Sequence, residues 1–277
     1  MITQAYLTEW GAGAPWPTAA QIEQDLILSR LIVEIAGHPL LSRELRLRGG
    51  TCLHKLHLPT AYRYSEDLDY VRTGDDPQLG LIFSALREIA IDRVGLREHR
   101  RRFPSEDSDM GCIWFDADPT SEAGRIRVKI EINVAETEPF LDPITLSYAV
   151  QSRWWSGAAR VPTFEPSELL ATKLRALYQR RKGRDLFDLW VALDALDVDD
   201  QVVVDGLGHY MRDAVYSYPE LQRNLEQKVG DRVFLEDLEQ LVAEPPAGYE
   251  PRVAAALVLQ RFGTRLRNAP AQDRWMS

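Results

Sequence analysis

LRGGTCLHKLHLPTAYRYSEDLDYV, the segment from Leu47 to Val71, opens with two adjacent glycines and a hydroxyl residue. Gly49 and Gly50 let the backbone adopt conformations that aim several N–H groups at one anion, and Thr51 follows them directly. A helix that begins near Thr51 would add its own N-terminal amides. Taken alone, such a trio is most often an ordinary turn. It is also the kind of loop that holds a phosphate.

Two carboxylates end the same segment. Alternate residues of a β-strand share one face, so Asp67 and Asp69 point the same way in the strand expected from Ser65 to Val71. Oxygen ligands that converge in this way suit Mg²⁺, which completes its shell with water and substrate phosphates. A Ca²⁺-binding EF-hand loop is excluded, because it requires glycine where Arg72 stands. A solvated strand edge would explain the pair alone, but the glycine loop before it favours a phosphate and metal site.

The composition describes an ordinary globular protein. The chain has 277 residues, enough for one large or two modest domains, and a net charge of −9, which argues against indiscriminate nucleic-acid binding. Cys52 and Cys112 cannot build a disulfide framework, and no Cys/His cluster suggests zinc. No stretch approaches the length of an apolar membrane helix, and no signal peptide is visible. We therefore expect a cytoplasmic protein.

Hydrophobic periodicity and breaker residues predict a mixture of helices and strands. Residues 1 to 17 are expected to form an irregular arm, and Thr18 with Gln21 gives a capping-box signature for a helix to Ala36. The further elements expected are a strand at Leu45 to Leu47, a turn at Asp75 to Pro77, a helix at Leu79 to Val94, strands at Cys112 to Ala117 and Arg125 to Val134, and helices at Pro166 to Gln179, Arg184 to Leu196 and Arg252 to Leu266.

The domain organisation follows from this pattern. Residues 135 to 165 contain several prolines and the pair Trp154-Trp155, and we expect a connecting stretch there that marks a domain boundary. The expected divisions are an N-terminal arm and helix at 1–45, a core at 46–150 and a helical C-terminal domain at 151–277. An α+β fold class results.

The motif of the opening segment resembles that of the AbiEii/AbiGii-type (MenT-like) nucleotidyltransferases, the toxins of type IV toxin–antitoxin and abortive-infection systems. Their pattern runs roughly GGT, a leucine, a lysine, then R-x-S-x-D-L-D. The matching residues are Gly49, Gly50, Thr51, Leu53, Lys55, Arg63, Ser65, Asp67, Leu68 and Asp69.

A second segment, SELLATKLRALYQRRKGRDLFDLW, carries the other half of the resemblance. Family members have a lysine on one helix and R-D-x-x-D-L at the start of the next, matched by Lys173, Arg184, Asp185, Asp188 and Leu189. Lys173 beside Arg184 could neutralise a departing pyrophosphate, and Asp188 could orient that lysine or assist deprotonation of the acceptor. A basic helix with ordinary i,i+4 pairing of Arg184 and Asp188 is the alternative.

The resemblance implies a polymerase-beta-like nucleotidyltransferase core with a C-terminal helical domain and the site between them. That fold places a third carboxylate on a strand beside the acidic pair. Glu131 is the candidate, on a strand whose apolar and polar residues alternate, although an ion pair with Lys129 on a half-exposed sheet would explain it equally well.

The implied reaction transfers NMP from an NTP to an acceptor, releasing pyrophosphate. The resemblance implies tRNA 3′ ends as acceptor, blocked translation as the outcome, and a cognate antitoxin as partner, with no membrane. The expected metal ligands for Mg²⁺ or Mn²⁺ are Asp67, Asp69 and Glu131, and these are also expected to be catalytic together with Lys173 and Asp188. The expected nucleotide-binding residues are Gly49, Gly50, Thr51, Lys55, Ser65, Arg184 and Asp185.

The run of arginines from Arg97 to Arg102 is expected to be either a solvated basic face or an RNA contact.

Ser65 lies two residues before Asp67 on the same face of the strand. A phosphate on its hydroxyl would therefore repel a triphosphate, and we hypothesise that an antitoxin controls the enzyme at this residue.

Two other functions stay open at this point. Antibiotic-modifying nucleotidyltransferases act on small molecules with the same first motif, but a basic helical face is less expected for their cationic acceptors. A non-catalytic binding member of the family is disfavoured by the intact Asp67, Asp69, Lys173 and Asp188.

Overall fold

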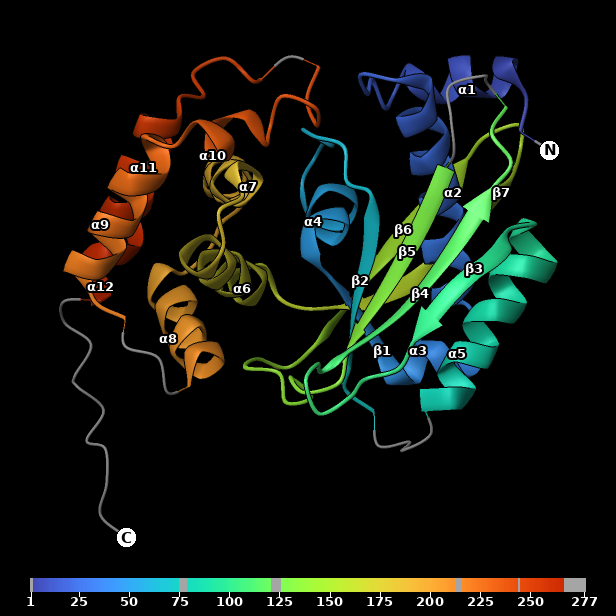
Figure 1. The fold of residues 1–277 in the computed structure, drawn as a ribbon, viewed down its shortest axis with the longest axis horizontal. Helices are drawn as coiled ribbons and strands as arrows, with labels where there is room; N and C mark the ends of the chain where they lie inside the picture. The colour runs from blue at the N-terminus through green and yellow to red at the C-terminus, as the bar shows by residue number, and fades with distance from the viewer. Residues whose placement is uncertain (1, 75–78, 121–125, 213–215, 244, 267–277) are drawn as a thin grey trace, which may run out of the picture. The chain divides into compact units, whose positions relative to one another are not determined.

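The chain forms two compact units (Figure 1). The computed structural model describes residues 2–74, 79–120, 126–212, 216–243 and 245–266. Unit 1 comprises Met1–Glu165 and Leu241–Ala243, and unit 2 comprises Pro166–Gln240 and Glu244–Ser277. The expected boundary between residues 150 and 151 falls within a strand of unit 1. A mixed sheet with helices in unit 1 confirms the α+β class.

Unit 1 is built on a sheet with strand order β3-β4-β5-β2-β1-β7-β6. Its strands are β1 (Leu45–Arg48), β2 (Asp67–Arg72), β3 (Arg97–Arg102), β4 (Met110–Ala117), β5 (Ile126–Asn133), β6 (Ile144–Gln151) and β7 (Ser156–Thr163). β2 runs parallel to β5 and β1 parallel to β7, while the other neighbours are antiparallel. The two expected site strands, β2 and β5, are therefore direct neighbours.

The helices of unit 1 are α1 (Gln4–Gly11), α2 (Ala19–Ala36), α3 (Pro39–Glu44), α4 (Gly49–Cys52), which continues into the π-helical segment η1 (Leu53–His57), and α5 (Leu79–Glu88), which continues into η2 (Ile89–Val94). The predicted capping box is present, with Thr18 and Gln21 bonded reciprocally at the start of α2. The irregular arm predicted for residues 1–17 is wrong over α1, whose single buried side chain is Leu7. One buried residue gives too weak a helical pattern to recognise.

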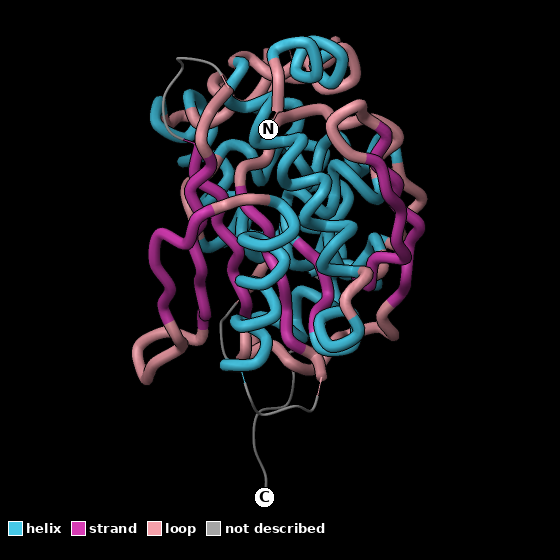
Figure 2. The backbone as a smooth tube through the Cα atoms, turned by 90° about the vertical axis from the view of Figure 1, so that its right-hand side faces the viewer, coloured by secondary structure: helices cyan, strands magenta, loops and turns pink. Residues whose placement is uncertain are grey.

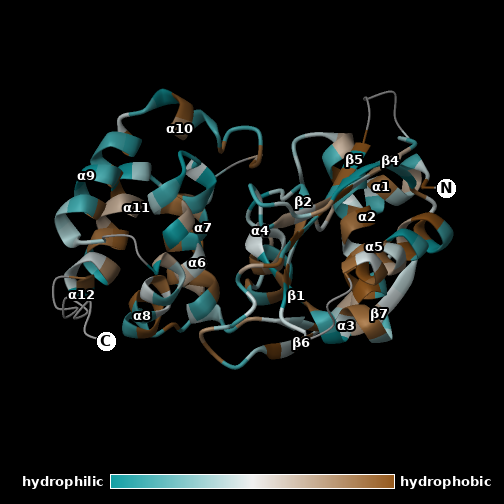
Figure 3. Ribbon diagram, turned by 60° about the horizontal axis from the view of Figure 1, so that its bottom comes forward, coloured by the Kyte–Doolittle hydropathy of each residue, from teal (hydrophilic) through white to brown (hydrophobic). Residues whose placement is uncertain are grey.

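One face of the sheet packs on helices, and the other carries polar side chains. Alternate residues of β5 and β4, such as Val128, Ile130, Ile113 and Phe115, are fully buried. α2 contacts β5, β6 and β7, and apolar residues are concentrated on α2 and α5 (brown in Figure 3). Figure 2 shows the backbone from the side of unit 1, with helices in cyan and strands in magenta.

The prediction of a connecting stretch at 135–165 is wrong, because this segment forms the hairpin of β6 and β7. β7 reads SGAARVPT, and its small residues give no hydrophobic alternation. Trp154 and Trp155 lie between the two strands, and both rings face Arg30 of α2, whose guanidinium carbon is 5.0 and 5.2 Å from the ring centroids. The pair therefore anchors the hairpin to the helix.

The chain returns to unit 1 after most of unit 2. The backbone N–H of Tyr64 donates to the carbonyl of Leu241 at 2.8 Å. Leu241 packs in one small cluster with Trp16 and Tyr64, just before β2. The loop that leads into the acidic strand is thus held by a residue far along the sequence.

Unit 2 consists of helices over its described residues. They are α6 (Pro166–Gln179), α7 (Gly183–Ala195), α8 (Asp200–Met211), α9 (Tyr218–Val229), α10 (Arg232–Glu236), α11 (Pro251–Val258), the π-helical η3 (Leu259–Gly263) and α12 (Thr264–Leu266). The approach of α7 to α10 requires Gly183, because a Cβ there would overlap the carbonyl of Phe234.

The expected turn at Asp75 to Pro77 and the residue Arg125 lie outside the described residues. Among the helices that are described, none combines the length and the hydropathy needed to cross a bilayer.

Candidate functional site

The glycine loop lies against the first acidic strand. β1 ends at Arg48, and Gly49 then takes a φ of +80°, a conformation that favours glycine. A Cβ at Gly49 would lie 2.9 Å from Cγ of Asp69, inside van der Waals contact. The Thr51 hydroxyl donates to the backbone carbonyl of Asp67 at 2.6 Å. The two halves of the opening motif are therefore in direct contact.

Gly50 makes room for two residues of the segment before β2. A Cβ at Gly50 would overlap the Arg63 guanidinium and would lie 3.1 Å from the Ser65 hydroxyl. Arg63 is buried and donates to the carbonyl of Tyr64 at 2.8 Å. Ser65 thus lies at the glycine loop, where its expected nucleotide contact stays a prediction.

The three expected metal ligands meet on two neighbouring strands. In the parallel pairing of β2 with β5, Asp67 lies opposite Lys129 and Asp69 opposite Glu131. Lys129 Nζ is 2.8 Å from Asp67 Oδ2 and 3.3 Å from Glu131 Oε2. The ion pair of Lys129 with Glu131 is present, and the same ammonium also binds Asp67.

The electrostatics of this cluster favour a bound cation. Burial, together with the charges of Asp69 and Glu66, raises the pKa of Asp67 to about 7 against the opposing effect of Lys129. Burial alone would lower the pKa of Lys129, but its bonds to Asp67 and Glu131 outweigh that effect and raise it. The pKa of Asp67 therefore stays above its ordinary value even with the ammonium of Lys129 beside it.

Asp67 and Asp69 fit a divalent metal by ligand type and by sharing one strand face. Over the described ranges, however, no three His, Cys, Asp or Glu side chains converge closely enough to hold a metal ion. Lys129 lies between Asp67 and Glu131, so Glu131 is bound to an ammonium in this structure. The acidic pair fits a metal, and Glu131 could join it only with Lys129 displaced.

Lys55 has a different environment from the one expected. Its ammonium lies 2.8 Å from Asp25 Oδ1 and 2.9 Å from the hydroxyl of Ser29, both on α2. Burial works to lower the pKa of Lys55, but Asp25 and Tyr148 outweigh burial and raise it. These contacts fix η1 to α2 and explain the lysine without a nucleotide.

The second motif forms a closed ion cluster within unit 2. Lys173 Nζ of α6 is 2.6 Å from Asp188 Oδ2 and 3.7 Å from Asp185 Oδ1 of α7. Arg180 adds two hydrogen bonds to Asp185, at 2.6 and 2.8 Å. Both aspartates are completely buried. The helix pairing thus brings Lys173 to Asp188, the carboxylate expected to orient it, and Asp185 joins them, whereas Arg184 lies beside Asp237.

The basic run between Lys173 and Arg184 is largely neutralised by residues from later in the chain. Arg181 pairs with Asp231, and Lys182 lies 3.1 Å from Asp237. The backbone N–H of Arg184 donates to Asp237 at 3.3 Å, and its guanidinium lies 4.0 Å from the same carboxylate. An uncompensated basic helical face is therefore not what this segment forms.

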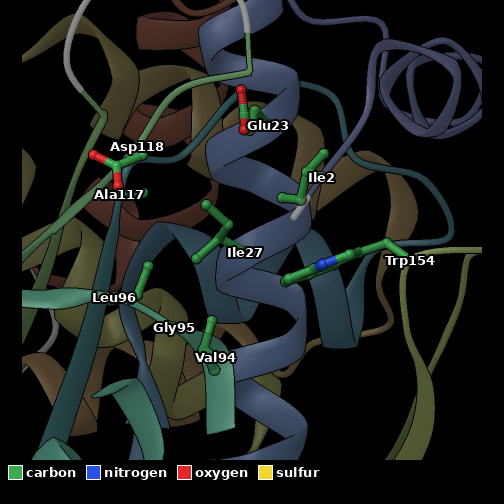
Figure 4. A pocket seen from close by; sticks show the side chains of 9 residues that line it. All are labelled: Ile2, Glu23, Ile27, Val94, Gly95, Leu96, Ala117, Asp118 and Trp154. Atoms are coloured by element: carbon green, nitrogen blue, oxygen red, sulfur yellow. The ribbon is translucent and has the colours of Figure 1, made fainter. Parts of the chain in front are cut away.

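A cavity of about 270 Å³ lies elsewhere in unit 1 (Figure 4). Ile2, Ile27 and Trp154 supply apolar walls, and Glu23 and Asp118 supply carboxylates. Glu23 accepts hydrogen bonds from the backbone N–H and hydroxyl of Thr120. None of the residues expected from the motifs lines this cavity, so it is separate from the candidate site.

Residues 30–262 match the model of a protein family described as nucleotidyl transferase AbiEii toxin, Type IV TA system. The chain belongs to this family. It is a nucleotidyltransferase of the type IV toxin–antitoxin class, which takes an NTP as substrate and has a cognate antitoxin. The family resemblance seen in the two motifs is confirmed.

Solved structures are similar to this chain, and the first of them shares its fold. The nucleotidyltransferase toxin MenT4 from Mycobacterium tuberculosis H37Rv matches with a TM-score of 0.68 at 18% identity, covering 96% of this chain and 90% of that chain. JHP933 from Helicobacter pylori matches with a TM-score of 0.48 at 15% identity, covering 90% of this chain and 91% of that one. No curated protein sequence matches the chain.

Two residues beside the AbiEii motifs were not among the expected site residues. Lys129 bridges two of the expected ligands, and Arg48 lies opposite Asp69 in the β1–β2 pairing and binds Glu136. The alternation of β5 places Lys129 on the same face as Glu131, a signal that was available. Arg48 could not have been found in that way, since its neighbour depends on pairing between distant segments.

Proposed function

We propose that this AbiEii-family enzyme transfers a nucleoside monophosphate from an NTP to the 3′ end of tRNA, with a divalent metal as cofactor, in the cytoplasm. The observation that carries the proposal is the contact between the glycine loop and the acidic strand. Gly49 touches Asp69, and Thr51 is bonded to the Asp67 backbone. A triphosphate at the loop would thereby lie next to the carboxylates. A polymerase-beta-like core is the corresponding fold assignment for unit 1.

Asp67 and Asp69 would hold Mg²⁺ or Mn²⁺, and Glu131 is the proposed third ligand. When bound, the metal supplies positive charge that activates the acceptor hydroxyl and stabilises the charge on the transferred phosphoryl group. The chain itself contributes the geometry. The loop of Gly49 and Gly50 positions the triphosphate, and the residues packed on Gly50 hold that loop in place.

Lys173 is proposed to act on the phosphates released in the reaction, with Asp188 as its positioning residue. Their 2.6 Å contact fixes the ammonium, and both side chains are almost excluded from solvent. A lysine held in this way has little conformational freedom to lose when it binds an anion. The nucleotide-binding roles of Lys55, Arg184 and Asp185 stay predictions, and the ion pairs of all three supply a structural explanation.

Labelled nucleotides test the proposal directly. The protein is incubated with each of the four labelled NTPs and total tRNA, with Mg²⁺, with Mn²⁺ or with EDTA. We expect label in RNA of tRNA size with at least one nucleotide, none with EDTA, and none with Asp67→Ala. Label that enters a protein or a small molecule, with no nucleotide labelling RNA, would overturn the tRNA assignment while leaving nucleotidyl transfer intact.

Ser65 offers a second test at the same loop. Its hydroxyl lies beside Gly50, so a phosphate on Ser65 would place negative charge where the triphosphate is proposed to bind. We expect Ser65→Glu to abolish NMP transfer and Ser65→Ala to retain most of it. Equal activity of the two variants would exclude control through this hydroxyl.

A further inference from the structure

Two rows of side chains cross the polar face of the sheet, from the edge strand β3 to the acidic strand β2. Residues directly opposite one another on neighbouring strands share a face of the sheet. The first row is Arg102, Cys112, Glu131 and Asp69, and the second is Arg100, Trp114, Lys129 and Asp67. We name these eight residues the polar strip.

Consecutive contacts link the edge of the strip to its acidic end. Arg102 Nη2 donates to Cys112 Sγ at 3.3 Å, and Cys112 Sγ lies 3.6 Å from Glu131 Oε1. In the second row, the guanidinium of Arg100 stacks 4.1 Å from the ring centroid of Trp114. The strip is therefore one continuous surface, with cations at the edge and carboxylates three strands away.

The charge at the edge is only partly balanced. Arg97 pairs with Asp118 at 2.6 Å, and Arg101 lies 3.4 Å from Glu98. Arg100 and Arg102 differ, because they contact an aromatic ring and a thiol. Both arginines are exposed.

The sheet order places different strands on the two sides of the acidic strand β2. The glycine loop follows β1, which flanks β2 on one side, whereas β5, β4 and β3 flank it on the other. The triphosphate proposed at the loop thus approaches from the β1 side. The β3 side is left for the acceptor. Three strand spacings of about 4.8 Å give ~14 Å between β3 and β2, room for about four stacked nucleotides.

We propose that the polar strip binds the single-stranded 3′ end of the acceptor RNA. Arg100 and Arg102 contact its phosphates, Trp114 offers a ring on which a base stacks, and the terminal hydroxyl is led to Asp67 and Asp69. Guanidiniums beside an aromatic ring are the usual means of binding single-stranded nucleic acid without reading its sequence. This inference rests on the proposed RNA acceptor and adds the path by which it reaches the site.

A pair of double variants on the same strand tests the inference. Arg100→Ala/Arg102→Ala removes the two arginines of the strip, and Arg97→Ala/Arg101→Ala removes the same charge from the arginines paired with Asp118 and Glu98. All four of these arginines are exposed, and thermal unfolding checks that each variant is folded. The measurements are KM for tRNA and for the NTP in the labelling assay, and anisotropy of a labelled single-stranded RNA at several salt concentrations.

We expect Arg100→Ala/Arg102→Ala to raise KM for tRNA about tenfold or more and to reduce the salt dependence of RNA binding by about 1.4 in log–log slope, as two lost phosphate contacts require. KM for the NTP should change less than about twofold, as should all parameters of the control variant. Trp114→Leu should raise KM for tRNA several-fold without changing the salt slope.

Three outcomes would overturn the inference. Equal effects of the two double variants would mean that only total charge matters. A raised KM for the NTP with unchanged RNA affinity would assign the strip to the triphosphate. If KM for tRNA and KM for the NTP are both unchanged while tRNA is labelled normally, the polar strip does not bind the acceptor. Failure of the protein to label any RNA, by contrast, would reject the proposed function itself.

Discussion

The acidic pair of unit 1 and the acidic pair of unit 2 have similar sequence spacing but opposite environments. Asp67 and Asp69 lie on a strand, where Asp67 retains about a quarter of its side-chain exposure and shares one lysine with Glu131. Asp185 and Asp188 lie on a helix, are completely buried, and have Lys173 and Arg180 as partners. In the first cluster the pKa of Asp67 is raised, and in the second each aspartate has a cation at 2.6 Å.

This difference in environment predicts different roles for the two clusters. The first is suited to binding a cation, and the second to holding its own side chains in place. A partly exposed carboxylate whose pKa is raised can gain free energy by taking up a cation. A buried cluster of paired charges holds its members in one geometry, since loss of either partner would leave a buried charge. We therefore expect substitutions in the two clusters to differ in whether they affect catalysis alone or stability as well.

Asp69→Asn should have the largest effect on activity and little effect on stability. Loss of a carboxylate that is proposed to bind the metal should reduce NMP transfer on the order of 1,000-fold. The free energy of unfolding should change by less than about 1 kcal/mol, because asparagine keeps the shape of the side chain and Asp67 keeps its ion pair with Lys129. Pyrophosphate release and urea unfolding measure the two quantities. Asp118→Asn, an exposed acid paired with Arg97, is the control and should alter neither.

Asp188→Ala should reverse that pattern by lowering stability. It leaves Lys173 buried without its closest partner, which should cost about 3–5 kcal/mol in urea unfolding. The double variant Lys173→Met/Asp188→Leu should recover much of that stability yet remain inactive. A stable Asp188→Ala protein would contradict the description of this cluster as one of buried, paired charges.

Gly49→Ala sharpens the contrast with a matched glycine. Gly49 and Gly95 both have positive φ, but only at Gly49 would a Cβ meet Asp69, while nothing lies within 4 Å at Gly95. Both alanines should cost about 1–2 kcal/mol in stability. Only Gly49→Ala should also reduce activity, by roughly 10- to 100-fold, through displacement of Asp69. Equal activity of the two variants would separate the glycine loop from the chemistry.

Asp67→Asn should stabilise the metal-free protein at alkaline pH. Because the folded-state pKa of Asp67, about 7, is raised above its unfolded value, ionisation destabilises the fold as pH rises between about 4 and 7. Asn does not titrate, so the variant should gain about 1–3 kcal/mol at pH 8 in EDTA and almost nothing at pH 4, after allowance for partial exposure. Absence of any gain at pH 8 would mean that Lys129 neutralises the cluster fully.

The sequence was sufficient for the parts of the site that depend on local spacing. Alternation along one strand placed Asp67 and Asp69 on one face, and the glycine pair predicted the loop that now contacts Asp69. α6 and α7 were likewise predicted from their helical periodicity, and the capping box at Thr18 was found where expected.

The parts that depend on pairing between distant segments could not be predicted. The register that sets Asp69 opposite Glu131 and Lys129 opposite Asp67 is a property of two strands far apart in sequence. The neutralisation of Arg181 and Lys182 by Asp231 and Asp237 is of the same kind. β7 was missed because its small residues leave no clear hydrophobic alternation, whereas β6 does alternate, with Ile144, Leu146, Tyr148 and Val150 on one face, and could have been predicted.

The hydrogen bond from Tyr64 to Leu241 has a consequence for when this toxin matures during its synthesis. A ribosome adding about 5–20 residues per second needs roughly 10–30 s to proceed from the acidic strand to Leu241. Throughout that interval the segment leading into β2 lacks its last anchor. The segment between the glycine loop and the acidic strand is therefore complete only when nearly the whole chain has been translated, and we expect the activity of the nascent enzyme to be delayed until it is close to release.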